Sequence, residues 1–496
     1  MFQRSEGQLI LPGDFFLPFG GKLSEDNRWV LLAAMIPWAK VEEKYAKSFK
    51  RSQKGQKAVP VRVALGALII QERLGTDDRE TLQQILENPY LQYFLGLPGY
   101  QNRRPFHASL MTHFRKRLGS DVLQEVNEWI ALEEVQKQTD EQGSDDDDSS
   151  GGNAAGSASG SLTHQNAEAP LHQGKLLLDA TCAPADMAYP TDLSLLNDAR
   201  EKLEIIIDLL HQPHRGKTAK PRTYRQKARK AYLAVSKQRR VKPRTMRKAI
   251  GKQLRFVARN LRTVAALAET SHLSALPRSL YKKLLVIQEL YRQQRQMFDE
   301  RSHSIPDRIV SISQPHVRPI VRGKAKASVE FGAKVAISLV NGFAFEEKRD
   351  WDNFNEGLTL KASVEAYYKR FGFYPEAVLA DQIYRNRENL RYCKGLGIRL
   401  SGPQLGRPSA NQEEAKRLSK VDASERNAIE GKFGEGKRCY GLGRIRARLQ
   451  ATSETVISMQ FLVMNLERRL RLFFLSFFAG LQTVRLCVNV RLLKLN

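Results

Sequence analysis

The sequence predicts an α/β protein with a mixed sheet flanked by helices, an all-helical N-terminal domain and a large helical insertion. Short apolar runs at 175–179, 329–340 and 377–381 are typical of buried strands. Amphipathic segments of helical period precede, separate and follow these runs. Because strands that alternate with helices form a sheet covered by helices, the order of these segments predicts the class.

Charge is the most unusual property of the composition. The 496 residues include 80 Lys or Arg and 53 Asp or Glu, which gives a formal net charge of +27. Such a surface favours a polyanionic partner, namely DNA, RNA or an acidic membrane. The four cysteines lie far apart and form no CxxC pair, so neither a zinc site of the usual spacing nor a disulfide framework is expected. No secretion signal is recognised, and we expect a cytoplasmic, nucleoid-associated protein.

The N-terminal domain is predicted to span residues 1–137 and to consist of short helices joined by tight turns. One apolar helix face follows the spacing i, i+4, i+7, i+8 and is formed by Val61, Leu65, Leu68 and Ile69. The short helix 109–118 carries the basic side chains His113, Arg115, Lys116 and Arg117. Short helices that end in a basic helix predict a DNA reader similar to a helix-turn-helix. The alternative is a plain helical bundle with a solvated basic face.

Two segments are predicted to lie outside the folded domains. Residues 138–170 form a flexible linker, because an acidic run is followed by a stretch composed almost wholly of Ser, Gly, Ala and Asn. Residues 470–496 form an apolar C-terminal extension that contains Arg485. Because a membrane span needs about 20 mostly apolar residues, we expect a docking helix or an irregular extension and no membrane partner. A membrane anchor is the alternative.

The third predicted domain spans residues 171–469 and contains the sheet. Its strands are expected at 175–179, 329–340, 342–347, 377–381 and 398–400. Asn341-Gly342 is a dipeptide typical of a hairpin turn. Helices are expected at 360–371, 386–394 and 416–433. The result is a mixed sheet with helices on its faces.

A basic helical insertion, residues 195–310, separates the first strand from the others. Within it, the block 215–262 holds nineteen Lys or Arg and no Asp or Glu. A block of like charges repels itself unless a polyanion screens it, so this block predicts contact with nucleic acid. The residues singled out for DNA binding are Arg229, Lys230, Arg239 and Arg240. The alternative is a solvated pair of basic helices.

Three acids are the best candidates for chemistry. Asp179 and Asp381 are each predicted to end an apolar strand, and Glu430 falls on the predicted charged helix. A carboxylate at the end of a buried strand is costly unless it is paired, protonated or bound to a metal. Carboxylates without a Cys/His cluster favour a hard ion such as Mg²⁺ or Mn²⁺. The alternative for either Asp is a cap on the following turn. Four rival acids rank lower: Asp186, Asp192, Asp350 and Asp352.

Three stretches resemble the acidic motifs of bacterial insertion-sequence transposases of the DDE type. They are Leu-Leu-Leu-Asp-Ala-Thr-Cys-Ala-Pro (176–184), Val-Leu-Ala-Asp-Gln-Ile-Tyr (378–384) and Glu-Arg-Asn-Ala-Ile-Glu-Gly-Lys-Phe-Gly (425–434). The IS-five-like group is the most similar, and the resemblance extends from about residue 24 to Arg469. It implies an RNase H-like catalytic core in which Asp179, Asp381 and Glu430 hold two Mg²⁺ or Mn²⁺ ions.

The resemblance also implies a reaction and its partners. The protein is expected to bind the terminal inverted repeats of its own element, to cleave DNA at each end, and to join the ends to target DNA as a homodimer on double-stranded DNA. Metal ions about 3.5–4 Å apart can activate a water and stabilise the leaving oxygen of a phosphodiester. Two alternatives remain open at this point. One is a metal-dependent DNA nuclease without strand transfer, and the other is a DNA-binding protein whose catalytic site has decayed.

Further basic residues follow the third motif. A related pattern in these transposases places an Arg four residues before the Glu and a Lys seven after it, and Arg426 and Lys437 match. The Tyr of that pattern is absent, because Ala423 occupies its place. On charge alone, Arg426 and Lys437 are expected to contact phosphates, with a solvated helix face as the alternative. Alternate positions then carry Arg444, Arg446 and Arg448, which are expected either to line a DNA channel or to form a solvated edge strand.

Overall fold

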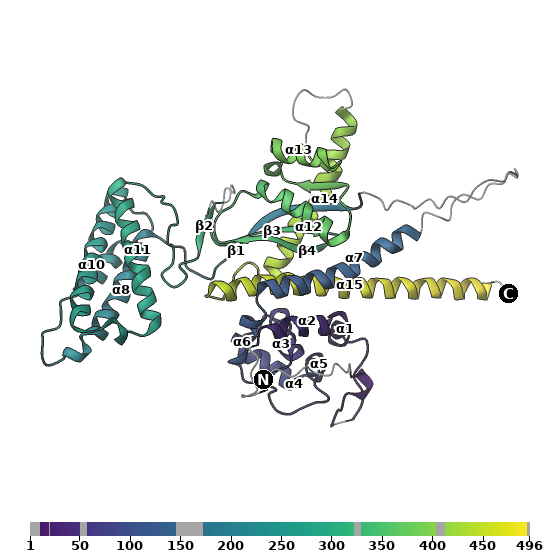
Figure 1. The fold of residues 1–496 in the computed structure, drawn as a ribbon, viewed down its shortest axis with the longest axis horizontal. Helices are drawn as coiled ribbons and strands as arrows, with labels where there is room; N and C mark the ends of the chain where they lie inside the picture. Colours follow the sequence, from purple (N-terminus) through teal and green to yellow (C-terminus); the bar gives the residue numbers. More distant parts are fainter. Residues whose placement is uncertain are drawn as a thin grey trace.

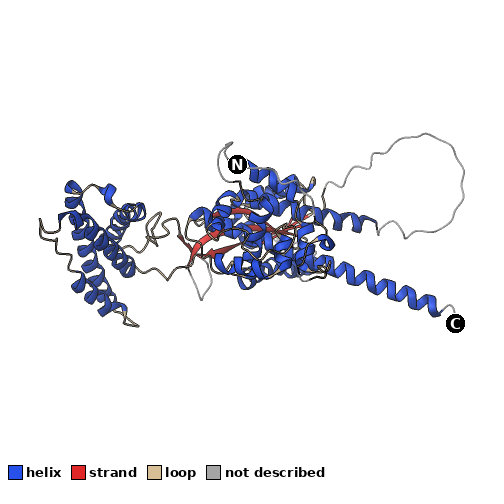
Figure 2. Cartoon of the chain, turned by 90° about the horizontal axis from the view of Figure 1, so that it is seen from below, coloured by secondary structure: helices blue, strands red, loops and turns tan. Residues whose placement is uncertain are grey.

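A computed structural model describes residues 10–18, 20–49, 57–144, 172–321, 329–402 and 412–493. The sheet lies at the centre, the N-terminal helices lie on one side of it, and the basic insertion stands at one end of the molecule (Figure 1). Seen from below, the insertion projects from one end of this body, and the last helix projects from the other (Figure 2). This arrangement confirms the predicted class, a mixed sheet flanked by helices, and is consistent with an RNase H-like core.

The N-terminal helices form because they carry apolar faces and because specific residues begin or end them. Their bounds are α1 Arg28–Met35, α2 Trp38–Lys47, α3 Val61–Leu74, α4 Asp78–Glu87, α5 Pro89–Phe94, α6 Leu110–Arg117 and α7 Ser120–Ser144. Gly75 ends α3 in a left-handed conformation, with a φ of 67°. Asp77 then caps α4 by accepting hydrogen bonds from the backbone N–H groups of Arg79 and Glu80. Residues 138–144, which fall in the predicted linker, continue α7, whereas residues 145–171 lie outside the described part of the chain.

Within the described residues, six strands form one mixed sheet. Their bounds are β1 Lys175–Pro184, β2 Arg318–Val321, β3 Val329–Val340, β4 Phe343–Asp350, β5 Ala377–Ala380 and β6 Arg399–Leu400. The order is β2-β3-β1-β5-β6, and β4 also pairs with β3. β1 is antiparallel to β3 and parallel to β5, and β5 is parallel to β6.

The predicted end of the first strand is wrong. β1 continues past Asp179 as far as Pro184, so Asp179 lies inside the strand and not at its end. The reason is pairing. β3 runs beside β1 from Leu177 to Pro184, whereas β5 accompanies it only as far as Leu178. The four residues from Ala180 to Ala183 lack the large apolar side chains of a strong strand signal, yet they are buried in the sheet.

Helices cover the sheet after the insertion. They are α12 Leu360–Phe371, α13 Arg387–Gly395, α14 Gln412–Cys439 and α15 Gln450–Leu493, with short 3-10 helices η4 Glu356–Leu358 and η5 Gln382–Tyr384 between them. α15 runs beside α7 between the sheet and the N-terminal helices (Figure 1). It therefore includes most of the predicted C-terminal extension. Among the described helices, none is both long and apolar enough to span a bilayer.

A buried amide pair ties the N-terminal helices to the sheet. Asn465 of α15 accepts a hydrogen bond of 3.0 Å from the N–H of Ala344 in β4, and it donates one of 2.8 Å to Asn127 of α7. Asn127 donates in turn to the carbonyl of Ala344, at 3.0 Å. One apolar core continues across this contact and contains side chains of the N-terminal helices, α15 and the sheet. The N-terminal helices are thus packed onto the rest of the body.

The insertion has an apolar core of its own. It consists of α8 Asp192–His211, α9 Arg225–Ser236, α10 Pro243–Thr270 and α11 Arg278–Glu300. α8 begins at a capping box in which Thr191 and Ser194 exchange hydrogen bonds with each other's backbone N–H. Leu203 of α8, Val257 of α10 and Ile287 of α11 are fully buried in this second core. The insertion is therefore an independent bundle attached to the sheet.

Candidate active site

The parallel register of β1 and β5 brings the first two predicted acids together. Leu178 of β1 lies opposite Ala380, the last residue of β5. Asp179 and Asp381 each follow one residue later, so they occupy neighbouring positions where β5 ends. Each carboxylate accepts a hydrogen bond of 2.7 Å from the next backbone N–H, which belongs to Ala180 and Gln382 respectively. Asp381 thereby caps η5, as the alternative for this residue had proposed.

The third predicted acid comes from a helix that is pinned to the edge of the sheet. Lys175 of β1 pairs with Glu425 of α14 at 2.7 Å, and Arg399 of β6 pairs with Asp422 at 2.5 Å. These contacts turn one face of α14 towards Asp179 and Asp381. The residues of that face follow helical spacing: Arg426, Glu430, Phe433, Gly434 and Lys437.

All three acids line one cavity of about 810 Å³. We call it the acidic cavity, and its other charged side chains are Lys334, Glu356, Arg426 and Lys437. Glu356 was not predicted, because it begins the short helix η4 after the β-hairpin, where the sequence shows no pattern. Lys334 is buried in β3 and binds Glu356 Oε1 at 2.9 Å and the Phe354 carbonyl at 2.7 Å. Glu356 is thus a fourth carboxylate in the cavity, partly neutralised by a buried ammonium group.

The electrostatics of the cavity favour a cation. The pKa of Asp179 is raised to about 6, mainly by burial and also by the negative charges of Glu356 and Asp381. The Ala180 N–H and the Arg426 guanidinium oppose this rise but do not cancel it. A buried carboxylate beside like charges holds its own charge poorly, so a positive ion placed there would be stabilised.

Oxygen donors of the kind that Mg²⁺ or Mn²⁺ prefers are present, although they are not gathered into a closed site. Among the residues that the structure describes, no three His, Cys, Asp or Glu side chains are grouped closely enough to hold a metal ion. The Nη1 atom of Arg426 instead lies 3.2 Å from Oδ1 of Asp381 and supplies positive charge there. Glu430 is exposed on the face of α14 that lines the cavity. The donor chemistry fits the implied ions, and Arg426 occupies one carboxylate oxygen of Asp381.

The four rival acids serve other contacts. Asp186 pairs with Arg444 at 2.7 Å, and Asp192 pairs with Arg308 at 2.7 Å. Asp350 and Asp352 lie near Lys348 and Arg318, at 3.9 and 3.6 Å. None of the four is among the residues that line the acidic cavity.

The predicted DNA-binding residues are divided among three places. Arg426 and Lys437 line the acidic cavity. Arg444, Arg446 and Arg448 are exposed in an extended segment whose Ile445 forms a bridge with Ala185, directly after β1. The remaining four are exposed on the insertion, Arg229 and Lys230 in α9 and Arg239 and Arg240 in the loop after it. The structure therefore does not bring these residues into one surface.

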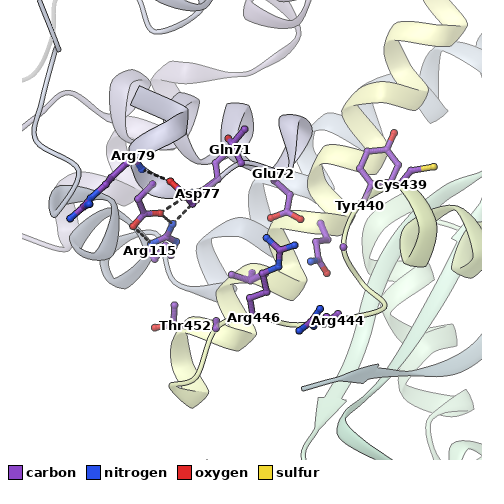
Figure 3. A pocket seen from close by; sticks show the side chains of 17 residues that line it. Gln71, Glu72, Asp77, Arg79, Arg115, Cys439, Tyr440, Arg444, Arg446 and Thr452 are labelled. Carbon is purple, nitrogen blue, oxygen red and sulfur yellow. Dashed lines mark hydrogen bonds and ion pairs between the residues drawn. The ribbon is translucent and has the colours of Figure 1, made fainter. Parts of the chain in front are cut away.

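A second cavity, of about 740 Å³, lies between the N-terminal helices and the segment before α15 (Figure 3). We call it the arginine cavity, because Arg79, Arg115, Arg444 and Arg446 line it. Arg115 of α6 pairs with Asp78 at the start of α4, and it also donates to Gln71 of α3. The Arg115 charge and its hydrogen bond hold the pKa of Asp78 below its usual range despite burial.

Glu72 of α3 points into the same cavity, towards Arg446 (Figure 3). Burial raises its pKa to about 7, while a hydrogen bond from Gln460 and the charges of Arg115 and Arg446 oppose the rise. The basic helix of the predicted DNA reader is thus committed to internal contacts. Arg117 also stacks on Phe49, 4.2 Å from the ring centroid. His113 and Lys116 are its exposed basic side chains.

Two segments of the chain match known protein families. Residues 378–467, which include Asp381 and Glu430, match the transposase DDE domain. Residues 18–117, which cover α1 to α6, match a second family described as a transposase domain. Both matched segments are therefore similar to domains of transposases. Asp179 lies outside both matched segments, and neither match distinguishes the IS-five-like group, so that narrower assignment stays a prediction.

One curated relative is an uncharacterized protein of Rhizobium meliloti, ORF8 in the nfe locus. It is 34% identical over 97 residues, which cover 20% of this chain and 46% of the relative. The chain therefore spans less than half the length of this relative. No solved structure matches the chain.

Proposed function

We propose that this protein is a transposase that cleaves the ends of its insertion sequence and joins them to target DNA, with Asp179, Asp381 and Glu430 as its catalytic residues. The observation that carries the proposal is the β1–β5 register, which sets Asp179 beside Asp381 where α14 presents Glu430. The raised pKa of Asp179 supports it, because perturbed carboxylates in a cavity are typical of functional sites.

The three carboxylates would hold two Mg²⁺ or Mn²⁺ ions. When bound, such ions polarise a water and the leaving oxygen of a phosphodiester. The chain itself supplies position and charge. Arg426 and Lys437 lie on the same face of α14 as Glu430 and would contact the phosphates on either side of the scissile bond. Transfer of Arg426 from Asp381 to a phosphate would free the carboxylate as DNA enters.

Double-stranded DNA is the proposed partner, at the terminal inverted repeats and at the target. Strand transfer needs two element ends in one complex, so we propose a homodimer on DNA. The net charge of +27 supports binding by counterion release, which makes affinity fall steeply as salt concentration rises.

The test is divalent-metal-dependent cleavage of DNA that carries the element ends. We expect Asp179→Asn, Asp381→Asn and Glu430→Gln each to lose cleavage by at least about a thousandfold while still binding this DNA, because transition-state electrostatics account for losses of this order. Asp352→Asn is the matched control, since this exposed acid lies outside the acidic cavity. Full activity in any one of the three variants removes that residue from the site.

A joining assay separates the alternatives. A nuclease would cut the end-containing DNA and never attach it to a second duplex. A decayed DNA-binding protein would bind this DNA with no metal-dependent cleavage in the native chain. The proposal requires that the native chain does both reactions.

A further inference from the structure

The exposed face of α10 carries an uninterrupted row of cations. Between Arg244 and Arg262 its exposed side chains are Arg244, Thr245, Lys248, Lys252, Arg255 and Arg262. The five basic ones recur every three, four or seven residues, which places them on one side of an α-helix. At 1.5 Å per residue the row is about 27 Å long. We call these five residues the α10 row.

The opposite face of α10 fixes the direction of the row. Leu254, Val257 and Val264 are buried in the core of the insertion, against α8. α10 is therefore held by packing, and its cations face away from the bundle. A rigid row loses less conformational entropy on binding than cations on a mobile tail would.

Part of the row lines a groove of about 520 Å³ between α10 and α11. Arg244, Lys248, Lys252 and Arg255 contribute to its wall, together with Phe298 of α11. A Cβ atom at Gly251 would lie 3.0 Å from the Phe298 ring, so the glycine lets this ring approach α10 closely. Arg247 stacks on the Phe298 ring, 4.2 Å from the ring centroid.

Among the residues that the structure describes, the members of the row have no acidic partner, whereas several cations of the neighbouring helices have one. Arg225 of α9 pairs with Asp208, Arg292 of α11 pairs with Glu289, and Arg295 pairs with Asp299. No ion pair to an acid is found for any member of the α10 row within the described part of the chain. Unpaired cations in a row repel one another, so their arrangement is stabilised by an external polyanion.

The charge and the length of the α10 row fit the phosphate backbone of duplex DNA. Double-stranded DNA carries one negative charge per about 1.7 Å of axis, so about eight base pairs match the length of the row. Thr245 is the one exposed neutral side chain between Arg244 and Arg262, and the Asn or Gln side chains that read adenine are absent from this surface. We infer that the α10 row binds the phosphate backbone of duplex DNA without reading its sequence. The inference rests on the proposed function for the identity of the polyanion, and it assigns the insertion to DNA outside the terminal repeats.

The experiment compares three forms of the full chain on two random-sequence duplexes of equal length, one AT-rich and one GC-rich. The first form is native, and the second carries Arg244→Gln, Lys248→Gln, Lys252→Gln and Arg255→Gln. The third is the matched control, with Arg278→Gln, Lys282→Gln, Lys283→Gln and Arg292→Gln in α11. It loses the same charge from the same bundle. Affinity is measured as a function of NaCl concentration, and thermal unfolding checks each form.

Each lost phosphate contact reduces the slope of log K against log salt by about 0.9, so the α10 form should lose about three to four from the magnitude of its slope. Its affinity near 0.1 M salt should fall at least about tenfold on both duplexes, and the α11 form should stay within about twofold of the native chain. Equal losses in the α10 and α11 forms would overturn the inference, as would an unchanged slope or a loss on one duplex only. If the α10 form unfolds at a lower temperature than the native chain, the double variant Lys248→Gln and Lys252→Gln replaces it. Half the change in slope is then expected.

Failure of the proposed function gives a different result. A native chain that binds random duplexes through the α10 row but never cleaves element ends contradicts the proposed function and leaves this inference intact. A chain that cleaves element ends and shows no α10 effect contradicts only this inference.

Discussion

The acidic cavity and the arginine cavity contain the same kinds of side chains and balance them differently. In the arginine cavity, Asp78 has Arg115 as its partner, and its pKa is lowered. In the acidic cavity, Asp179 lies beside Glu356 and Asp381, and its pKa is raised to about 6. Burial acts in the same direction on both carboxylates, so the neighbouring charges make the difference.

In the arginine cavity the charges stabilise the fold, whereas in the acidic cavity the charges favour a ligand. A carboxylate with a guanidinium partner between two helices contributes to holding them together. In the acidic cavity the carboxylates outnumber the basic side chains, so the group favours an added cation. Single substitutions in each of the two cavities test this difference.

Loss of the arginine in the arginine cavity should have the largest effect on stability. Arg115→Met leaves Asp78 partly buried without its partner, and breaking such a pair should cost about 3 kcal/mol of the free energy of unfolding. Lys116→Met, one position further along α6 and exposed, should cost less than about 0.5 kcal/mol. Urea unfolding of the full chain measures both. Equal stability of the two variants would show that the Arg115–Asp78 pair does not hold α6 to α4.

Loss of the arginine in the acidic cavity should act on the reaction. Arg426→Met should leave the free energy of unfolding within about 0.5 kcal/mol, because its contact with Asp381 is largely exposed. Cleavage of element ends should fall about 10- to 100-fold, because a phosphate contact is lost. Arg417→Met, exposed earlier in α14, serves as the control. The distinction between the cavities fails if Arg426→Met destabilises the chain as much as Arg115→Met.

The acid of the arginine cavity, Glu72, should make stability depend on pH. The pKa of Glu72 is about 7 in the folded chain and near its usual 4.5 when unfolded. Below about pH 4.5 the carboxyl is protonated in both states and costs nothing, and above 7 it is ionised in both and the folded state bears the cost of burial. Because Glu72 is only partly buried, we expect a penalty of about 1–2 kcal/mol that appears between pH 4.5 and 7.

Glu72→Gln should therefore raise the unfolding temperature relative to the native chain at pH 8 and leave it unchanged at pH 4. The groups that face Glu72 include Arg115, Arg446 and Gln460. A variant with the same advantage at both pH values would assign the effect to packing and not to the charge.

The smallest expected effect concerns the fourth carboxylate of the acidic cavity. Glu356→Gln removes one negative charge and leaves the ammonium group of Lys334 less neutralised. Both changes disfavour a cation in the cavity, so the Mn²⁺ concentration for half-maximal cleavage should rise about two- to fivefold, which corresponds to roughly 0.5–1 kcal/mol. Asp352→Asn should not change it. An unaltered Mn²⁺ requirement would show that Glu356 takes no part in the field of the cavity.

Much of the fold was predictable because local and long-range preferences agree. The amphipathic helix at 360–371 and the strand at 329–340 have the predicted bounds. The hairpin turn at Asn341-Gly342 is also confirmed, with positive φ angles of 47° and 79°. In these segments the residue types favour the same conformation that the sheet and its covering helices require.

The parts that were not predicted depend on pairing or on loops. β2 is short and its residues lack alternation, so only its pairing with β3 defines it. The extent of β1 is set by β3, and Glu356 reaches the acidic cavity from the short helix η4, which no sequence pattern reveals. Asp179 and Asp381 could be chosen from their place after apolar residues, whereas their adjacency required the parallel register. The catalytic role of the three acids stays a prediction.

The antiparallel pairing of β1 with β3 has a consequence for the history of the chain. β1 ends at Pro184 on one side of Gly332 in β3, and β2, which follows the bundle, begins at Arg318 on the other side of Gly332. The basic bundle is therefore a long turn between β1 and β2, and its two points of attachment are close together. Because loop closure depends only weakly on loop length, such a turn can be lengthened, shortened or exchanged without disturbing the strands that carry the acids. Related proteins could differ in the DNA contacts made by this bundle and keep the same acids. A short designed turn could also replace the bundle altogether.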